Sequence, residues 1–114
     1  MPILKIQTNA TLTKPQQDQI LTDCSTLTAQ QLAKPERYVM IMIEQKTNMI
    51  FDGNDSPAMY LEFKSIGLPE DQTAQISAAL SQYFFDEIGM PANRIYIEFS
   101  NAQRHLWGWN GETF

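Results

Sequence analysis

Hydrophobic residues alternate with polar ones at the start of the chain and then adopt a helical spacing. Residues 2–8 show the alternation of a strand. Within residues 14–33, mostly apolar side chains recur at steps of three and four, which is typical of one face of a helix. These side chains are Ile20, Leu21, Cys24, Leu27, Thr28 and Leu32. The pattern predicts a strand followed by an amphipathic helix.

Local signals set the ends of this helix. Thr13, with Gln16 three residues later, has the spacing of a capping box. Pro15 falls in the first turn, where its missing N–H group costs little. Pro35 disfavours a helical conformation at Lys34, so the helix is expected to end just before these residues.

The middle of the chain predicts two strands separated by a loop. Residues 38–43 are apolar without a break, which indicates a strand buried on both faces. Residues 44–57 are rich in charged residues, Gly, Asn and Pro and predict a loop, in which residues 49–51 are a candidate edge strand. Alternation returns over residues 58–65, the next predicted strand.

The second half repeats the order of the first. Pro69 is expected at the first position of a second helix, and Gly89 is expected to end it. Its apolar stripe consists of Ile76, Leu80, Tyr83, Phe84 and Ile88. Residues 94–99 predict another strand, and the aromatic tail at residues 105–109 is a candidate short strand.

The element order predicts a single α+β domain over residues 1–114. The strand–helix–strand order occurs twice, which favours a duplicated β-α-β unit with pseudo-repeats of about 1–50 and 51–114. Crossover connections of one hand would place both helices on one face of a four-stranded mixed sheet. The other face would be lined by Val39, Ile41 and Ile43 or their neighbours, and by Ile95 and Ile97. Because no further helix remains to cover it, we expect a second subunit there.

Composition and charge exclude several classes of function. The chain of 114 residues has a net charge of −5 and a pI of about 4.6, which argues against binding nucleic acid or an anionic membrane surface. It has no apolar run long enough to span a bilayer, and its first residues do not predict a signal peptide. We therefore expect a cytoplasmic protein, and the sequence leaves leaderless secretion open.

Cysteine and histidine usage predicts neither a metal site nor a cofactor site. Cys24 is the only cysteine and His105 the only histidine, so an intrachain disulfide or a zinc site of usual composition is not expected. The five glycines are scattered and form no phosphate-binding loop. Cys24 lies on the apolar stripe, where we expect a small buried side chain.

Pro2 is the candidate catalytic residue. Removal of Met1 would leave a secondary amine at the beginning of the first strand. A free α-amino group has a pKa near ~8, and burial in an apolar pocket would lower it. A shift of about two units requires roughly 2.7 kcal/mol, and would make Pro2 a general base at neutral pH.

Five ordered motifs carry a resemblance to a known family. They are Pro2, Lys34-Pro35 before a strand, Ser65-Ile66-Gly67 after the next strand, Arg94-Ile95-Tyr96-Ile97, and Gly108-Trp109-Asn110 with Thr113-Phe114. Over essentially its whole length, the chain resembles the macrophage migration inhibitory factor and D-dopachrome tautomerase family of the tautomerase superfamily. The resemblance implies a duplicated β-α-β fold that assembles as a homotrimer.

The same resemblance implies keto–enol tautomerisation of phenylpyruvate-type 2-keto acids. Pro2 would shuttle a proton between the enol oxygen and C3, while Lys34 and the backbone N–H of Ile66 bind the polar end of the substrate. The residues that would line the pocket are Ile3, Tyr38, Tyr96, Trp107, Trp109 and Phe114, with Tyr96 supplied by the neighbouring subunit. The charge of Lys34 would also disfavour protonated Pro2.

The chain departs from the family pattern at three places. Ala58 and Leu61 stand where the vertebrate cytokine has a Cys-x-x-Cys pair, so thiol–disulfide oxidoreductase activity is not expected. Glu98 replaces an asparagine that contacts the para-hydroxyl of the substrate, so we expect a changed preference between phenylpyruvate and its para-hydroxy analogue. Trp107 is larger than its counterpart, which would narrow the mouth of the pocket.

Two alternatives follow from the same residues. The chain could be a cytokine-like signalling or protein-binding module with a vestigial pocket. It could also keep the proline but catalyse hydration, dehalogenation or decarboxylation, as superfamily relatives do with added arginines near the amine. The three arginines, Arg37, Arg94 and Arg104, have no assured pocket position in the sequence.

Overall fold

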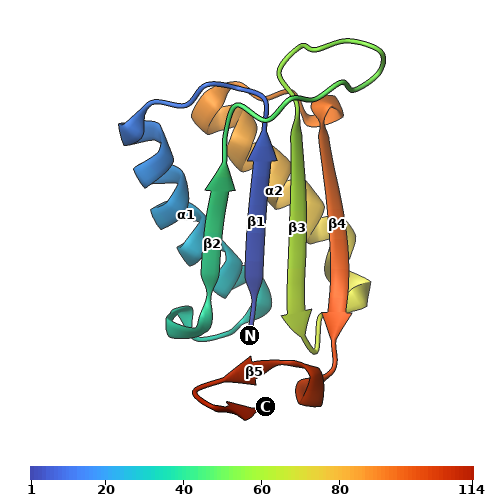
Figure 1. Cartoon of the computed structure of the whole chain (residues 1–114). Coiled ribbons are helices and arrows are strands. Elements are labelled where there is room, and N and C mark those ends of the chain that lie inside the picture. The colour runs from blue at the N-terminus through green and yellow to red at the C-terminus, as the bar shows by residue number, and fades with distance from the viewer.

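A four-stranded mixed sheet forms the centre of the molecule in the computed structural model, which describes residues 1–114 (Figure 1). Its strands are β1 (Ile3–Thr8), β2 (Met40–Glu44), β3 (Met59–Ile66) and β4 (Ile95–Ala102). The spatial order is β2-β1-β3-β4. β1 runs parallel to β2 and antiparallel to β3, and β3 runs parallel to β4.

Both helices lie on the same face of this sheet, as Figure 1 shows. They are α1 (Lys14–Leu32) and α2 (Thr73–Ile88). The largest fully buried side chains of the core come from β1, β3 and both helices, and include Leu4, Ile6, Ile20, Leu61, Phe63, Ile76, Leu80 and Phe84. Burial of such a side chain contributes about 1.5–3 kcal/mol, so this layer is the main source of stability. The predicted α+β architecture is confirmed.

The ends of α1 follow from the residues that cap it. The Thr13 hydroxyl accepts a hydrogen bond from the Gln16 N–H at 3.2 Å, and the Gln16 side chain accepts one from the Thr13 N–H at 2.8 Å. A cap of this kind contributes about 1 kcal/mol. At the other end Ala33 adopts a left-handed conformation with φ 52°, which turns the chain away before Lys34. The predicted capping box is confirmed.

The strand predicted over residues 38–43 begins later and is less buried than expected. Pro35 is followed by a 3-10 turn, η1 (Glu36–Tyr38), and β2 begins only at Met40. β2 is an edge strand in the sheet order, so Met40 is 57% exposed. The prediction of burial on both faces was therefore wrong for the isolated chain, because the position of a strand within the sheet cannot be read from its own residues.

Two further local predictions need correction. Pro69 does not occupy the first position of α2, because a 3-10 turn, η2 (Glu70–Gln72), comes between them. Residues 49–51 form no edge strand; Phe51 makes only an isolated bridge with Asn54.

The Arg94 side chain anchors the loop that contains Phe51. Arg94 is buried at the end of the turn η3 (Ala92–Arg94) and donates hydrogen bonds to four backbone carbonyls of the loop. The acceptors are the carbonyl oxygens of Phe51 at 2.7 Å, Asn54 at 3.5 Å, Ser56 at 2.8 Å and Pro57 at 3.2 Å. The Arg94 side chain thus satisfies loop carbonyls that have no partner in a neighbouring strand.

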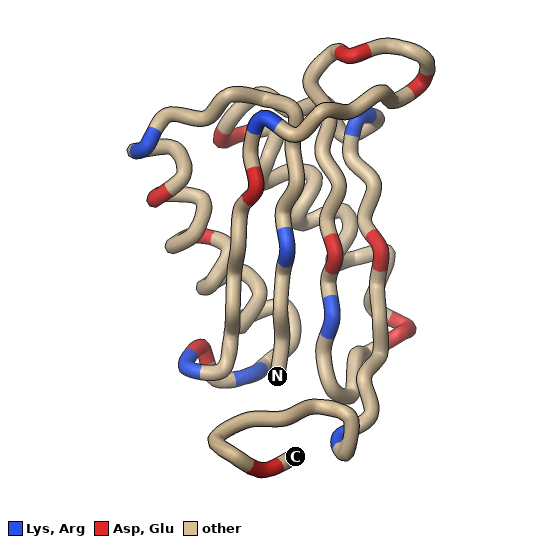
Figure 2. The backbone as a smooth tube through the Cα atoms, in the orientation of Figure 1, with Lys and Arg blue, Asp and Glu red and all other residues tan.

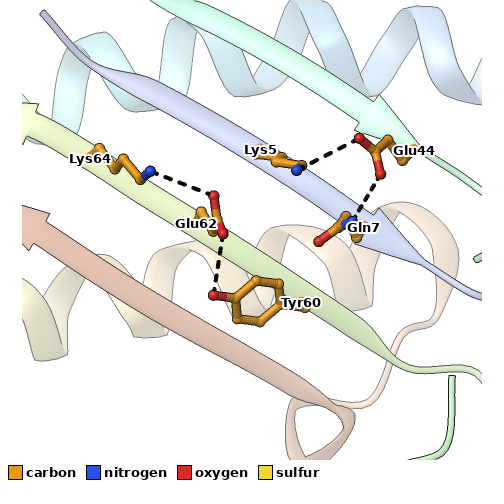
Figure 3. Close-up of polar contacts among 6 residues, drawn as sticks. All are labelled: Lys5, Gln7, Glu44, Tyr60, Glu62 and Lys64. Atoms are coloured by element: carbon orange, nitrogen blue, oxygen red, sulfur yellow. Dashed lines mark hydrogen bonds and ion pairs between the residues drawn. The ribbon is translucent and has the colours of Figure 1, made fainter.

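The sheet face opposite the helices is more polar than predicted. Ile41, Ile43 and Ile97 pack toward the core, and Ile95 is buried in it. Because strand side chains alternate, the outward positions include Met40 and Met42 at one edge and charged residues in the middle. Figure 3 shows the polar contacts there: Lys5 with Glu44 at 3.7 Å, Gln7 with Glu44 at 2.8 Å, Lys64 with Glu62 at 3.8 Å, and Tyr60 with Glu62 at 3.5 Å.

The C-terminal segment folds back toward the N-terminus, as Figure 1 shows. After the turn η4 (Arg104–Leu106), the short strands β5 (Gly108–Trp109) and β6 (Glu112–Thr113) pair as a hairpin. The Phe114 N–H then donates a hydrogen bond to the Trp107 carbonyl at 3.2 Å. This hairpin brings the predicted aromatic tail to the beginning of β1. Neither helix is sufficiently long and apolar to cross a membrane.

Candidate functional site

The beginning of β1 lies between two cavities. Pro2 is fully buried, and its carbonyl accepts a hydrogen bond from the Met40 N–H at 3.1 Å, which fixes it beside β2. Met1 lines both cavities, so the N-terminus of the chain lies beside both of them. With Met1 in place, the Pro2 nitrogen is an amide nitrogen; the free amine of this chain belongs to Met1.

One cavity, of about 330 Å³, carries positive charge and is called the cationic cavity. It is lined by Met1, Ala33, Lys34, Pro35, Tyr38, Ile66, Arg104 and Phe114. Lys34 reaches it because α1 ends at the left-handed Ala33, and Arg104 reaches it from η4. Figure 2 shows basic positions around the end of the sheet that carries the N-terminus. Two of its lining side chains are cationic and none is that of an Asp or Glu, so these side chains favour an anion.

The other cavity, of about 240 Å³, is mainly apolar, and because four of its eleven lining residues are aromatic it is called the aromatic cavity. It is lined by Met1, Pro2, Ile3, Arg37, Tyr38, Val39, Met40, Trp107, Gly108, Trp109 and Phe114. The rings of Trp109 and Phe114 stack with 5.8 Å between centroids, and Tyr38 meets Trp109 edge-on at 5.5 Å. Such walls suit a flat apolar group.

The electrostatic environment favours a neutral N-terminal amine. Burial lowers the pKa of the Met1 amine below its usual value, and the positive charges of Lys34 and Arg104 lower it further. A lower pKa leaves more of the amine unprotonated at neutral pH, which is the form that accepts a proton. An amine at this end of the chain is therefore shifted toward its unprotonated form beside a cavity suited to an anion.

Most predicted site residues gather here. Pro2, Ile3, Lys34, Tyr38, Ile66, Trp107, Trp109 and Phe114 all line one or both cavities.

Tyr96 and Glu98 do not reach this site within one chain. In the sheet register, Tyr96 is level with Tyr60, which is level with Gln7. Gln7 lies roughly 17 Å along β1 from Pro2 at the usual rise of a strand. Tyr96 is instead 65% exposed beside Phe51, and Glu98 accepts a hydrogen bond from the Tyr60 hydroxyl. Within a single chain, these two residues therefore lie away from Pro2.

Arg104 and Arg37 are site residues that the sequence did not identify. Arg104 lines the cationic cavity, whereas Arg37 lines the aromatic cavity and donates a hydrogen bond to the Tyr38 hydroxyl at 3.4 Å. The third arginine, Arg94, is committed to the loop carbonyls described above. No local periodicity marks Arg104; its proximity to Trp107 in the aromatic tail was the only available signal. No group of three His, Cys, Asp or Glu side chains is placed to hold a metal ion.

Comparison with known proteins defines the class of protein. The family model described as "Macrophage migration inhibitory factor (MIF)" matches residues 1–114. The macrophage migration inhibitory factor homolog of Trichinella spiralis is 35% identical over 115 residues, covering 100% of both chains.

Solved structures of macrophage migration inhibitory factor proteins have the same fold as this chain. The macrophage migration inhibitory factor homologue from Prochlorococcus marinus superimposes with a TM-score of 0.92 at 37% identity, covering 98% of each chain. The macrophage migration inhibitory factor of Toxoplasma gondii superimposes with a TM-score of 0.91 at 34% identity, covering 98% of this chain and 99% of the other. The chain belongs to the macrophage migration inhibitory factor family of the tautomerase superfamily.

Proposed function

We propose that this protein is a keto–enol tautomerase for phenylpyruvate-type 2-keto acids, with Pro2 as its general base and acid after removal of Met1. The observation that carries the proposal is the position of the first two residues, because Met1 lines both the cationic and the aromatic cavity and Pro2 lines the aromatic cavity. The charges of Lys34 and Arg104, which lower the pKa of the Met1 amine, would act in the same direction on a Pro2 amine exposed by removal of Met1, and a base must be unprotonated to act.

The proposed reaction follows from this arrangement. The carboxylate enters the cationic cavity, and the phenyl ring enters the aromatic cavity. The amine of Pro2 removes a proton from C3, the electron pair of that C–H bond forms the C2=C3 double bond, and the π pair of the C2=O bond moves to its oxygen. That oxygen then takes the proton from the Pro2 ammonium, which returns the amine to its starting form. The return direction moves a proton from the enol oxygen to C3 through the same amine. No cofactor is consumed.

We further propose that the working form is a homotrimer. In the single chain, Tyr96 and Glu98 lie far from Pro2, whereas the resemblance assigns both to a pocket that includes it. Tyr96 and Ile50 are 65% and 77% exposed, which is unusual for large apolar side chains and leaves surface for a neighbour to cover. The site would then be completed by a strand of the adjacent subunit.

The test combines intact mass with an assay of enol decay. We expect the active material to lack Met1, and a chain whose Pro2 nitrogen is blocked by a retained extra residue to lose activity by roughly 10²–10⁴-fold, the usual contribution of a general base. Pro15→Ala is the matched control, because Pro15 is an exposed proline at the beginning of α1. Equal activity of blocked and processed chains would remove Pro2 from the mechanism.

A further inference from the structure

The basic residues of this chain fall into two groups. Lys5, Lys14 and Lys64 form ion pairs with carboxylates, and Arg94 is held by four carbonyls. The remaining four, Lys34, Arg37, Lys46 and Arg104, have no ion-pair partner in the structure. Three of these four line the two cavities at the N-terminus, although acidic residues outnumber basic ones by 13 to 8 in the chain. Their charges are therefore available to a ligand.

The positive charges of Arg104 and Lys34 both act on the N-terminal amine. Both line the cationic cavity with Met1, and both lower the pKa of its amine. The Arg104 side chain donates no hydrogen bond within the chain, so all its donors remain free. A guanidinium presents two parallel N–H groups that match a carboxylate, whereas a lysine ammonium acts as a compact point charge.

We propose that Arg104 binds the carboxylate of the 2-keto acid, leaving Lys34 to neutralise the oxygen on C2. This inference rests on the proposed function. Removal of the C3 proton shifts negative charge onto that oxygen, next to a carboxylate that is already charged. One cation cannot serve both groups equally well, and only the charge on the C2 oxygen grows toward the transition state. Arg104 thus determines specificity for acids, and Lys34 supports the chemical step.

The two roles predict different outcomes for different substrates. Arg104→Gln should lower kcat/KM for phenylpyruvate roughly 10- to 100-fold, as expected on losing a charge-assisted contact, mainly through KM. At a pH above the acidic limb of the profile, it should leave kcat/KM for the methyl ester of phenylpyruvate nearly unaffected, because the ester has no carboxylate. Lys34→Gln should lower kcat for both the acid and the ester. Arg104→Lys should restore part of the preference for the acid.

The pH profile provides a second readout. The titratable side chains that line either cavity are Lys34, Arg37, Tyr38 and Arg104. Removal of the Arg104 charge makes protonation of the amine easier, so its pKa rises. The acidic limb of kcat/KM for the ester should therefore move to higher pH in Arg104→Gln. A merely structural role of Arg104 would not produce this shift.

Binding can be measured without turnover. Trp107 and Trp109 line the aromatic cavity, so quenching of their fluorescence by 3-phenylpropanoate and by its methyl ester reports affinity directly. Arg104→Gln should weaken binding of the acid and spare the ester. Lys46→Gln is the charge-matched control, because Lys46 is exposed, unpaired and outside both cavities.

The outcomes separate the two proposals. Absence of enol turnover in the processed wild-type chain would overturn the proposed function, while the binding measurement would still test Arg104. Turnover that depends on Pro2, together with an equal effect of Arg104→Gln on acid and ester, would overturn the role of Arg104 alone. An unchanged thermal transition in Arg104→Gln confirms that the variant folds, as expected for an exposed side chain.

Discussion

The ring of Phe51 lies 4.5 Å from the ring of Tyr96, at the end of the sheet far from Pro2. Both rings line a depression of about 840 Å³, together with the exposed Ile50. This surface joins the loop held by Arg94 to the beginning of β4. It is therefore the part of the chain where we expect the neighbouring subunit to pack.

Ile50→Glu should weaken assembly of the trimer. A carboxylate in a buried interface loses its hydration, so association should become weaker and the apparent mass in light scattering should fall at low protein concentration. Phe85→Glu is the control, because Phe85 is also exposed, at 56%, but lies on α2 on the other side of the sheet. A trimer that survives Ile50→Glu and dissociates in Phe85→Glu would place the interface on the helices instead.

Signals from neighbouring residues predicted most of the helices and strands. The error in the predicted burial of β2 arose because the position of a strand within the sheet depends on residues far away in the sequence. Thr13 and Gln16 marked the beginning of α1 because a capping box involves only neighbouring residues. Cys24 proved buried, as its place on the helical stripe predicted, and burial raises the pKa of its thiol to about 12. Met40 was misjudged because its exposure depends on β2 being an edge strand, a property of the whole sheet.

In the candidate site too, residues marked by local motifs could be predicted, and a residue placed by long-range folding could not. Pro2, Lys34 and the aromatic tail could be proposed from ordered motifs in the sequence. Arg104 could not, because it enters the cationic cavity only when η4 and the C-terminal hairpin fold back toward β1. Neither the direction of that hairpin nor the absence of a carboxylate partner is encoded in a local pattern.

Glu98→Asn should change the preference between phenylpyruvate and its para-hydroxy analogue. Glu98 lies on the open face of β4 and accepts a hydrogen bond from the Tyr60 hydroxyl, so it presents a carboxylate to the proposed neighbouring pocket. A carboxylate accepts a hydrogen bond from a phenol but cannot donate one. We expect the ratio of the two kcat/KM values to differ between wild type and variant. Identical ratios would show that Glu98 does not contact the substrate.

The ionisation of Tyr60 provides an independent test of its contact with Glu98. The hydrogen bond to Glu98 is the main cause that raises the pKa of Tyr60 to about 12. The contact is therefore complete below the ordinary tyrosine pKa of ~10 and is lost as the pH rises through 12. In Glu98→Asn the pKa of Tyr60 should fall toward ~10, measured by tyrosinate absorbance with Tyr60→Phe to assign the signal. An unshifted titration would contradict the contact.

Replacement of Arg94 should destabilise the protein more than any other single arginine change. Arg94→Gln removes the charged donors of four loop carbonyls and leaves some of these acceptors without a partner. Breaking such a network costs about 2–4 kcal/mol of the free energy of unfolding. Urea unfolding at one fixed protein concentration measures the loss, since dissociation of an oligomer adds a concentration dependence.

Arg37→Gln is the matched control for Arg94→Gln. Arg37 is exposed, and its side chain donates only to the Tyr38 hydroxyl, so its loss should cost less than about 1 kcal/mol. The loop held by Arg94 also carries Phe51, which packs on Tyr96. Arg94→Gln should therefore weaken trimer assembly as well as folding. A stable trimer with wild-type unfolding would show that the loop keeps its position without Arg94, and that the packing of Phe51 on Tyr96 is sufficient to hold it.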